Sequence, residues 1–189
     1  MDSIEGVFAC MGNTYYRRKK DEPRAWFHEY EHKFEPSKGL LSDLDSAVAK
    51  SKYPTKTGRH YENRTGMINF SIVGRNATQE QRNEYAAYDA EHKERQAIVE
   101  KLRKKHPKYD FVIGGAVSID IFNEGHDKSQ VIREHFKDLP ADVIIHFVGD
   151  RIEYPGNDYA IAEAVNKRAY GNVHSVESWQ DTAALLKSI

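Results

Sequence analysis

The sequence predicts a Rossmann-like α/β core, present in part, that is interrupted by an inserted α+β domain. Beyond residue 128 strand and helix patterns alternate, which is typical of a parallel α/β arrangement. Residues 143–148 form a nearly continuous apolar run, as expected of a strand buried on both faces of a parallel sheet. Residues 24–127 indicate an antiparallel sheet with helices on one face. We therefore predict a partial core from residues 1–23 and 128–189 and an inserted domain from residues 24–127.

The inserted domain is predicted to hold a helix, a half-buried strand, a long helix and two more strands, in that order. The first strand alternates apolar and polar side chains, and the long helix begins at Thr78, which forms a capping-box pattern with Gln81. Pro107 ends that helix. The predicted ranges are 40–50, 67–72, 78–106, 110–114 and 116–122.

The two flanking segments carry the elements assigned to the core. The first has a short strand closed by Gly12-Asn13 and then a charged, exposed connection, and the second alternates helix and strand. Ser178 is expected to cap the last helix. The predicted ranges are 4–10 and 15–21 in the first segment, and 131–136, 143–148, 159–167, 172–176 and 178–189 in the second.

Composition narrows the class of protein. The chain has 189 residues and a formal net charge of −1, so nucleic-acid binding driven by bulk charge is not expected. Its one cysteine, Cys10, cannot form an internal disulfide, which favours a reducing compartment. The sequence has no apolar run long enough to span a membrane and no basic segment of a secretion signal. We expect a cytoplasmic protein with no membrane or nucleic-acid partner.

Two carboxylates and a lysine are candidates for phosphate chemistry in the second segment. Asp150 directly follows the buried strand, where open parallel sheets bind ligands, and Asp158 lies in the same loop. Together they suit Mg²⁺, although Asp158 is equally placed to cap the following helix. Lys128 lies at the predicted domain junction and could neutralise a transferring phosphoryl group. An ordinary surface lysine is the alternative.

Five residues of the inserted domain are candidates for binding a phosphorylated sugar. Arg75 lies just before the long helix and Arg82 in its first turns, where backbone N–H groups already favour an anion. Arg64 is a third arginine that could contact phosphate. Ser118 and Asp120 lie two apart on one strand and therefore face the same side, where they suit sugar hydroxyls. An ordinary polar sheet face is the alternative.

Histidine and cysteine chemistry is not expected. His28 and His32 have the i, i+4 spacing of a helical metal pair, but a third ligand is not evident and a charged, solvated face is the preferred interpretation. Cys10 has no evident histidine partner and is a poor nucleophile candidate.

Several motifs together resemble the eukaryotic-type phosphomannomutases of the haloacid-dehalogenase (HAD) superfamily. The similarity runs from about Val7 to the C-terminus. Its strongest stretches are Asn63-Arg64-Thr65-Gly66-Met67-Ile68-Asn69, Gly74-Arg75 with Gln79-Glu80-Gln81-Arg82, residues 114–128 and residues 149–158. The resemblance implies a HAD-like core with a cap, and an enzyme that interconverts mannose 6-phosphate and mannose 1-phosphate with Mg²⁺ for GDP-mannose synthesis.

The resemblance also implies roles for individual residues. Arg64, Arg75 and Arg82 would hold the distal phosphate, and Ser118 and Asp120 would contact that phosphate and the sugar hydroxyls. Lys128 would be the core lysine and Asp150 a magnesium ligand. The resemblance implies a hexose phosphate as the small-molecule partner. It also implies a homodimer through the cap, or pairing with a complete homologue.

The sequence departs from the family pattern at the nucleophile. The family's first core strand carries Asp-x-Asp-x-Thr, and this motif does not occur in these 189 residues. The stretch beyond Asp158 is also altered, from Ala160 to Ala164. We therefore expect this chain alone to be inactive as a mutase, and the alternative is a non-catalytic sugar-phosphate-binding or regulatory protein.

Overall fold

The computed structural model describes residues 4–19, 21–22 and 25–188, which form two compact units, Met1–His126 and Asp127–Ile189. Their boundary lies next to the expected domain junction at residues 127 and 128. Residues 6–18, which the sequence analysis assigned to the core, instead pair with a strand of the first unit. The assignment of a core and a cap stays a prediction, and each unit is described by itself below.

The first unit begins with a three-stranded antiparallel sheet of β1 (Gly6–Ala9), β2 (Thr14–Arg18) and β3 (Trp26–Glu31). A single 3₁₀ turn, Cys10–Gly12, joins β1 to β2. The expected exposed connection after residue 15 is therefore wrong for residues 15–18, which are part of a strand. Packing against β1 explains the difference, because the Tyr15 ring is buried and stacks on Phe8 at 4.2 Å, while Arg17 is exposed.

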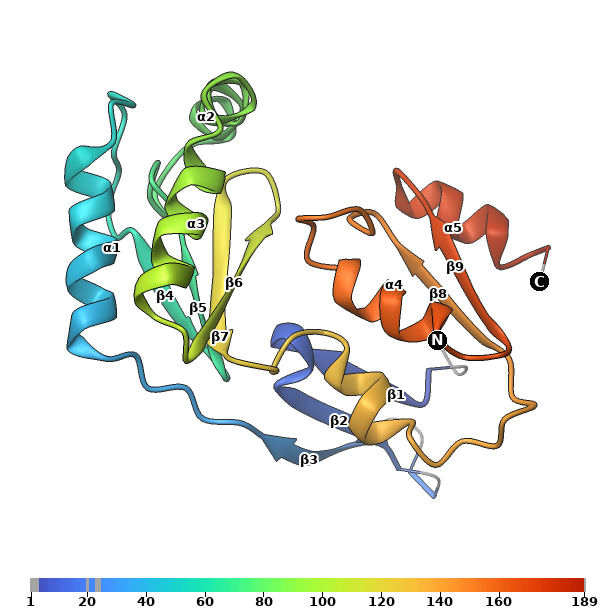
Figure 1. Ribbon diagram of the computed structural model, residues 1–189. Coiled ribbons are helices and arrows are strands. Elements are labelled where there is room, and N and C mark those ends of the chain that lie inside the picture. Colours follow the sequence, from blue (N-terminus) through green and yellow to red (C-terminus); the bar gives the residue numbers. More distant parts are fainter. Residues whose placement is uncertain (1–3, 20, 23–24, 189) are drawn as a thin grey trace. The chain divides into compact units, whose positions relative to one another are not determined.

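The larger sheet of this unit has four antiparallel strands in the order β4-β5-β7-β6 (Figure 1). Helices α1 and α3 lie side by side on one face of it, as the sequence predicted. The strands are β4 (Tyr61–Arg64), β5 (Met67–Phe70), β6 (Tyr109–Gly114) and β7 (Ser118–Asn123), and the helices are α1 (Lys38–Lys50), α2 (Gln79–His92) and α3 (Glu94–Lys105).

The hydrophobic core of the first unit lies between these helices and the sheet. One face of the strands contributes Ile68, Phe70, Ile119 and Ile121, and the helices contribute residues that are equally buried. Burial of aromatic and aliphatic side chains on this scale is the main favourable term in folding. Among the helical residues are Leu40 and Leu44 of α1, Tyr85 of α2, and Val99 and Leu102 of α3.

The predicted long helix is divided into α2 and α3 at one residue. The capping box of Thr78 and Gln81 is present at the start of α2, as expected. Lys93, however, has left-handed backbone angles, φ 54° and ψ 33°, and ends α2. The Asp89 carboxylate accepts a hydrogen bond from the backbone N–H of Arg95 at 2.7 Å, and so stabilises the start of a second helix.

The second unit contains the expected order of helix and strand. Strand β8 (Ile145–Gly149) pairs in parallel with β9 (Gly171–Ser175), and the crossover helix α4 (Tyr159–Asn166) contacts both strands. This is a βαβ unit, so the expected α/β character is confirmed. A five-residue π-helical segment (Val131–His135) precedes β8, and α5 (Trp179–Leu185) follows β9 and ends earlier than expected.

The expectation that residues 143–148 form a strand buried on both faces is wrong for this structure. His146 is exposed, and Ile144 keeps 56% of its surface accessible. Within the described residues β9 is the sheet neighbour of β8, so the second edge of β8 has no strand beside it. The apolar run therefore meets a packed layer only on the side of α4.

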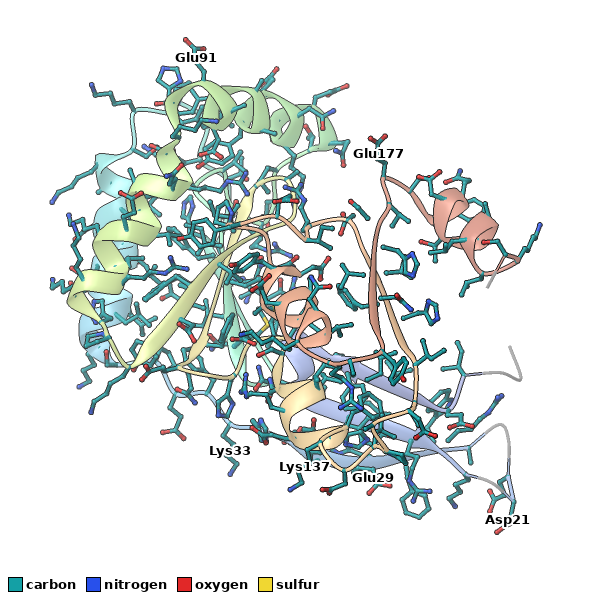
Figure 2. All side chains as sticks on the ribbon, turned by 45° about the vertical axis from the view of Figure 1, so that its right-hand side comes forward. Asp21, Glu29, Lys33, Glu91, Lys137 and Glu177 are labelled. Atoms are coloured by element: carbon teal, nitrogen blue, oxygen red, sulfur yellow. The ribbon has the colours of Figure 1, made fainter. Side chains whose placement is uncertain are left out.

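Charged side chains cover the outside of both units (Figure 2). Among them, Glu29 and Lys33 extend from the first unit near β3, Glu91 from α2, and Lys137 and Glu177 from the second unit. Over the described ranges, every helix is too short or too polar to cross a membrane.

Candidate functional site

Polar side chains form a row across three strands of the large sheet. The register pairs Glu62 of β4 with Asn69 of β5, and Asn69 with Asp120 of β7. Because side chains alternate along each strand, this row lies on the face opposite the hydrophobic core. At the other end of the same face Met11 packs on Met67 and Phe122. The polar row therefore lies on a sheet that has the hydrophobic core on one face and the Met11 cluster at one end of the other face.

A hydrogen-bonded chain joins Arg75 to Asp120 through Asn69. The Arg75 Nη1 group donates to the Asn69 side-chain oxygen at 2.7 Å, and the Asn69 amide donates to Asp120 Oδ1 at 2.6 Å. Asn69 and Asp120 keep only 4% and 7% of their surfaces accessible. Because buried polar groups without partners are costly, this network fixes the positions of all three side chains. The structure thus brings together two of the predicted site residues, Arg75 and Asp120.

Arg64 and Arg82 lie beside Arg75, by different contacts. The Glu62 carboxylate accepts from Arg64 Nη2 at 3.2 Å and pairs with Arg75 Nη2 at 2.7 Å. Arg82 uses its guanidinium to hold the loop before α2, donating to the backbone oxygens of Arg75 and Ala77 at 3.2 Å each. The three predicted arginines therefore lie at β4, in the loop before α2 and in the first turn of α2.

Ser118 begins β7 on the same face as Asp120. Its hydroxyl donates to the Gly114 carbonyl at 2.9 Å across the β6–β7 turn. Gly114 is required there, because a Cβ at that residue would lie 2.4 Å from Asp120 Oδ2. The buried Arg95 donates to the carbonyls of Gly114, Gly115 and Ser118, which anchors the turn from the α3 side.

Two residues of this site were missing from the sequence prediction. Glu62 lies two positions before Arg64 and so faces the same side of β4, and Asn69 is a polar residue inside an apolar strand. Both patterns were visible in the sequence. Their roles depend on which residues of neighbouring strands they face, and this register is not visible in the sequence.

The second unit brings Lys128 and Asp158 together. Lys128 Nζ lies 2.5 Å from Asp158 Oδ1, and the Asp158 side chain keeps 7% of its surface accessible. Asp158 Oδ2 also accepts from the Arg151 backbone N–H at 3.3 Å. Asp158 occupies the N-cap position of α4, but its side chain makes no capping hydrogen bond. Its carboxylate therefore serves an ion pair rather than the cap that was one of the two interpretations.

The donors for a divalent cation are few in the second unit. Asp150 follows β8 directly and is exposed, while both oxygens of Asp158 are engaged by Lys128 and by Arg151. Across the part of the chain that the structure describes, no group of three or more histidine, cysteine or acidic residues is placed to hold a metal. Since Mg²⁺ prefers six oxygen ligands, these residues do not form a complete site for it.

The histidine pair considered in the sequence is not on a helix. His28 lies in β3 and His32 follows that strand, so the two residues are separated by roughly 13 Å of extended chain rather than by one helical turn. His28 contacts the Thr14 hydroxyl at 3.1 Å, whereas His32 and His126 both contact the buried Asn13 side chain. The two rings therefore make separate contacts within the first unit.

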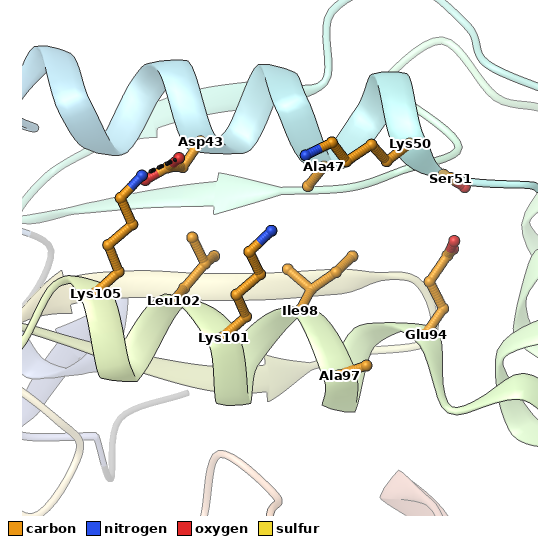
Figure 3. A pocket seen from close by; sticks show the side chains of 10 residues that line it. All are labelled: Asp43, Ala47, Lys50, Ser51, Glu94, Ala97, Ile98, Lys101, Leu102 and Lys105. Carbon is orange, nitrogen blue, oxygen red and sulfur yellow. Dashed lines mark hydrogen bonds and ion pairs between the residues drawn. The ribbon is translucent and has the colours of Figure 1, made fainter.

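A cavity of about 220 Å³ lies between α1 and α3, on the opposite face of the sheet from the polar row (Figure 3). Ala47, Ile98 and Leu102 supply apolar surface, and Lys105 pairs with Asp43 at its end at 2.6 Å. None of the predicted site residues is among those that line it. The strand residues Ser118 and Asp120 belong to the other face of the sheet.

The folds of the two units define the class of protein. An antiparallel sheet covered by helices on one face, together with a parallel βαβ unit, is the combination expected of a HAD-like protein with a cap. Two solved structures of Plasmodium falciparum IMP-nucleotidase share the fold, with TM-scores of 0.60 and 0.56 at 15% and 16% identity. They match 97% and 94% of this chain, which spans 47% and 46% of theirs.

Sequence comparison identifies the family. The model of the eukaryotic phosphomannomutase family matches residues 1–189. Phosphomannomutase of Saccharomyces cerevisiae is 44% identical and that of Schizosaccharomyces pombe 39% identical over the whole chain, which spans 72% of each. The Dendrobium officinale phosphomannomutase is 40% identical over 81% of the chain and 58% of its own length. The chain belongs to the eukaryotic phosphomannomutase family.

Proposed function

We propose that this chain binds a hexose phosphate on the polar face of the β4–β7 sheet. Arg64 and Arg75 contact the phosphate, with Arg82 holding the loop that carries Arg75. Ser118 and Asp120 contact the phosphate and the sugar hydroxyls. The observation that carries this proposal is the buried hydrogen-bonded chain from Arg75 through Asn69 to Asp120. It holds a guanidinium group that can donate to phosphate beside a carboxylate that can accept from a sugar hydroxyl.

The reaction that we propose is the interconversion of mannose 6-phosphate and mannose 1-phosphate, which supplies GDP-mannose synthesis. These 189 residues contain no Asp-x-Asp-x-Thr. A segment with that motif must therefore supply the nucleophile, and this chain alone binds its ligand without turnover. The relatives named phosphomannomutase support the reaction class.

Lys128 is proposed to lie against the transferring phosphoryl group. Asp158 holds the ammonium group in place, because it is buried and pairs with it directly. A charged lysine so placed stabilises the negative charge that shifts during phosphoryl transfer. We propose Asp150 as a ligand of the Mg²⁺ that the family implies, which would polarise the phosphate. The remaining ligands, including any from Asp158, require a different arrangement of that carboxylate.

A non-catalytic sugar-phosphate-binding or regulatory role is the second candidate. One observation favours it: the whole polar network, from Glu62 to Asp120, lies within one compact unit and is satisfied by residues of that unit. Binding through this network does not depend on a nucleophile. In this role the chain would compete for, or store, the phosphorylated sugar.

The proposed partner is a second copy of the chain or a complete homologue, associated through the first unit. Among the described strands, β4 has β5 as its one neighbour, which leaves a sheet edge for pairing. We propose a cytoplasmic setting, because the single cysteine cannot support an internal disulfide.

Phosphorus NMR with mannose 1-phosphate tests the binding proposal. We expect the ligand resonance to shift with the purified chain, and Arg75→Ala to abolish that shift. The matched control is Arg17→Ala, which removes an arginine from an exposed pair with Glu29 in the other sheet. Unchanged binding by folded Arg75→Ala would contradict the proposed site. Formation of mannose 6-phosphate by the chain alone would contradict the need for a further segment.

A further inference from the structure

Glu62 places a carboxylate between the two guanidinium groups proposed to receive phosphate. One of its oxygens, Oε2, lies 3.2 Å from Arg64 Nη2 and 2.7 Å from Arg75 Nη2. Each arginine thus directs a donor at the same carboxylate oxygen. This geometry is the one by which two arginines bind an external oxyanion.

The contact offsets part of the positive charge that a ligand would meet. Arg64 and Arg75 carry two positive charges, and Glu62, which pairs with both, opposes them with one negative charge. Burial by itself raises the pKa of Glu62, but the hydrogen bond from Arg64 and the charges of Arg64, Arg75 and Arg59 outweigh it and hold that pKa below its usual range. Glu62 is therefore ionised at neutral pH and offsets one of the two arginine charges.

We propose that Glu62 is an internal competitor for the phosphate subsite. With no ligand bound, its carboxylate occupies the Nη2 donors of Arg64 and Arg75. A phosphate must displace it from at least one of them. Glu62 thereby keeps the arginines ordered and sets an upper limit on affinity, so that product leaves readily. The inference rests on the proposed function, since it concerns how the same site controls its ligand.

Removing the competing charge must strengthen binding, most of all for a doubly charged ligand. Coulomb energy is proportional to the charge of the ligand, and at separations of about 4 Å a unit charge contributes about 1 kcal/mol even in bulk water. That figure corresponds to roughly fivefold in affinity per ligand charge. The logarithm of the gain for a dianion is about twice that for a monoanion. A residue that only supported the fold would not distinguish the two ligands.

The test is Glu62→Gln, measured by phosphorus NMR titration at low salt and a pH of about 8. Mannose 1-phosphate serves as the dianion, since phosphomonoesters have a second pKa near 6, and dimethyl phosphate serves as the monoanion. We expect Glu62→Gln to bind mannose 1-phosphate at least fivefold more tightly, with a smaller gain for dimethyl phosphate. The control is Glu29→Gln, which removes the same charge from the exposed pair with Arg17.

The outcomes separate the inference from the proposed function. Equal affinities of Glu62→Gln and the unchanged chain would overturn the inference, and weaker binding would show that Glu62 positions the arginines without competing. An equal gain in the Glu29→Gln control would also overturn it, because the effect would be one of net charge. If the unchanged chain does not bind mannose 1-phosphate, or if Arg75→Ala binds it normally, the proposed function itself fails.

Discussion

Replacing Asp89 with alanine should destabilise the first unit far more than removing an ordinary surface carboxylate. Asp89 and Arg95 keep 7% and 8% of their surfaces accessible, and their side chains pair at 2.8 Å. Asp89 also accepts from the backbone N–H of Arg95 at the start of α3. Without this partner the Arg95 guanidinium remains buried and unpaired. It stays bound to three carbonyls of the β6–β7 turn, which do not neutralise its charge.

The expected cost follows from burial. Removing one partner of a buried ion pair typically costs about 3–5 kcal/mol, because the other charge is left without compensation. For a chain of this size each kcal/mol lowers the melting temperature by roughly 2–4 °C, so the loss is about 6–20 °C. The matched control is Glu29→Ala, whose pair with Arg17 is exposed and worth about 0–1 kcal/mol.

Thermal unfolding followed by circular dichroism measures the difference, and hydrogen exchange at Ser118 and Asp120 reports on the turn. The double variant Asp89→Ala with Arg95→Met removes the unpaired charge and should recover part of the loss. A melting temperature of Asp89→Ala within about 2 °C of the Glu29→Ala control would refute the reasoning. So would a double variant that is no more stable than Asp89→Ala alone.

Three further substitutions test the loop before α2 and the first turns of α1. Gly74 has φ +85°, and a Cβ there would lie 1.8 Å from the Thr57 carbonyl oxygen, so Gly74→Ala should cost at least about 2 kcal/mol and weaken phosphate binding. Gly39→Ala in α1, where the nearest atoms lie at 3.9 Å, should instead leave the free energy of unfolding unchanged or raise it by up to about 1 kcal/mol. Denaturant titration measures both glycine variants. Hydrogen bonds from a lysine and a histidine lower the pKa of Asp43, so its stabilisation is complete above the unfolded pKa of about 3.9 and lost as the pH falls through the lower folded pKa. Asp43→Asn should therefore cost at most about 1 kcal/mol at pH 6 and less at pH 2; an equal loss at both would contradict this origin.

Local patterns were sufficient for most elements of the fold. The capping box of Thr78 and Gln81 identified the start of α2, because it depends only on residues three apart. The alternation over residues 67–72 identified β5 for a similar reason. The break at Lys93 was not visible, because a left-handed lysine is tolerated there only with the Asp89 carboxylate and the buried Arg95 in place. Such contacts depend on how the helices pack on the β6–β7 turn.

The predictable part of the candidate site is the part that depends on the alternation of side chains along a single strand. The spacing of Ser118 and Asp120 correctly placed both on the same side of β7. The pairing of Lys128 with Asp158 was not predictable, because 30 residues separate them and the cation and cap interpretations of Asp158 were equally consistent with the sequence. The family resemblance supplied the choice of arginines, which spacing alone would not have selected among the many charged residues.

Asn69 explains how one sheet face can keep an acid and an arginine in fixed positions. Its amide donates to Asp120, and its oxygen accepts from Arg75, so each charged group is oriented by a neutral neighbour. A carboxylate at this position would pair with Arg75 but repel Asp120, and an apolar residue would leave the buried Asp120 oxygen with one partner fewer. Only a side chain with both a donor and an acceptor can bond to both Asp120 and Arg75. Glu62 pairs with Arg75 directly, and it is the less buried of the two acids and the one able to move aside for a ligand.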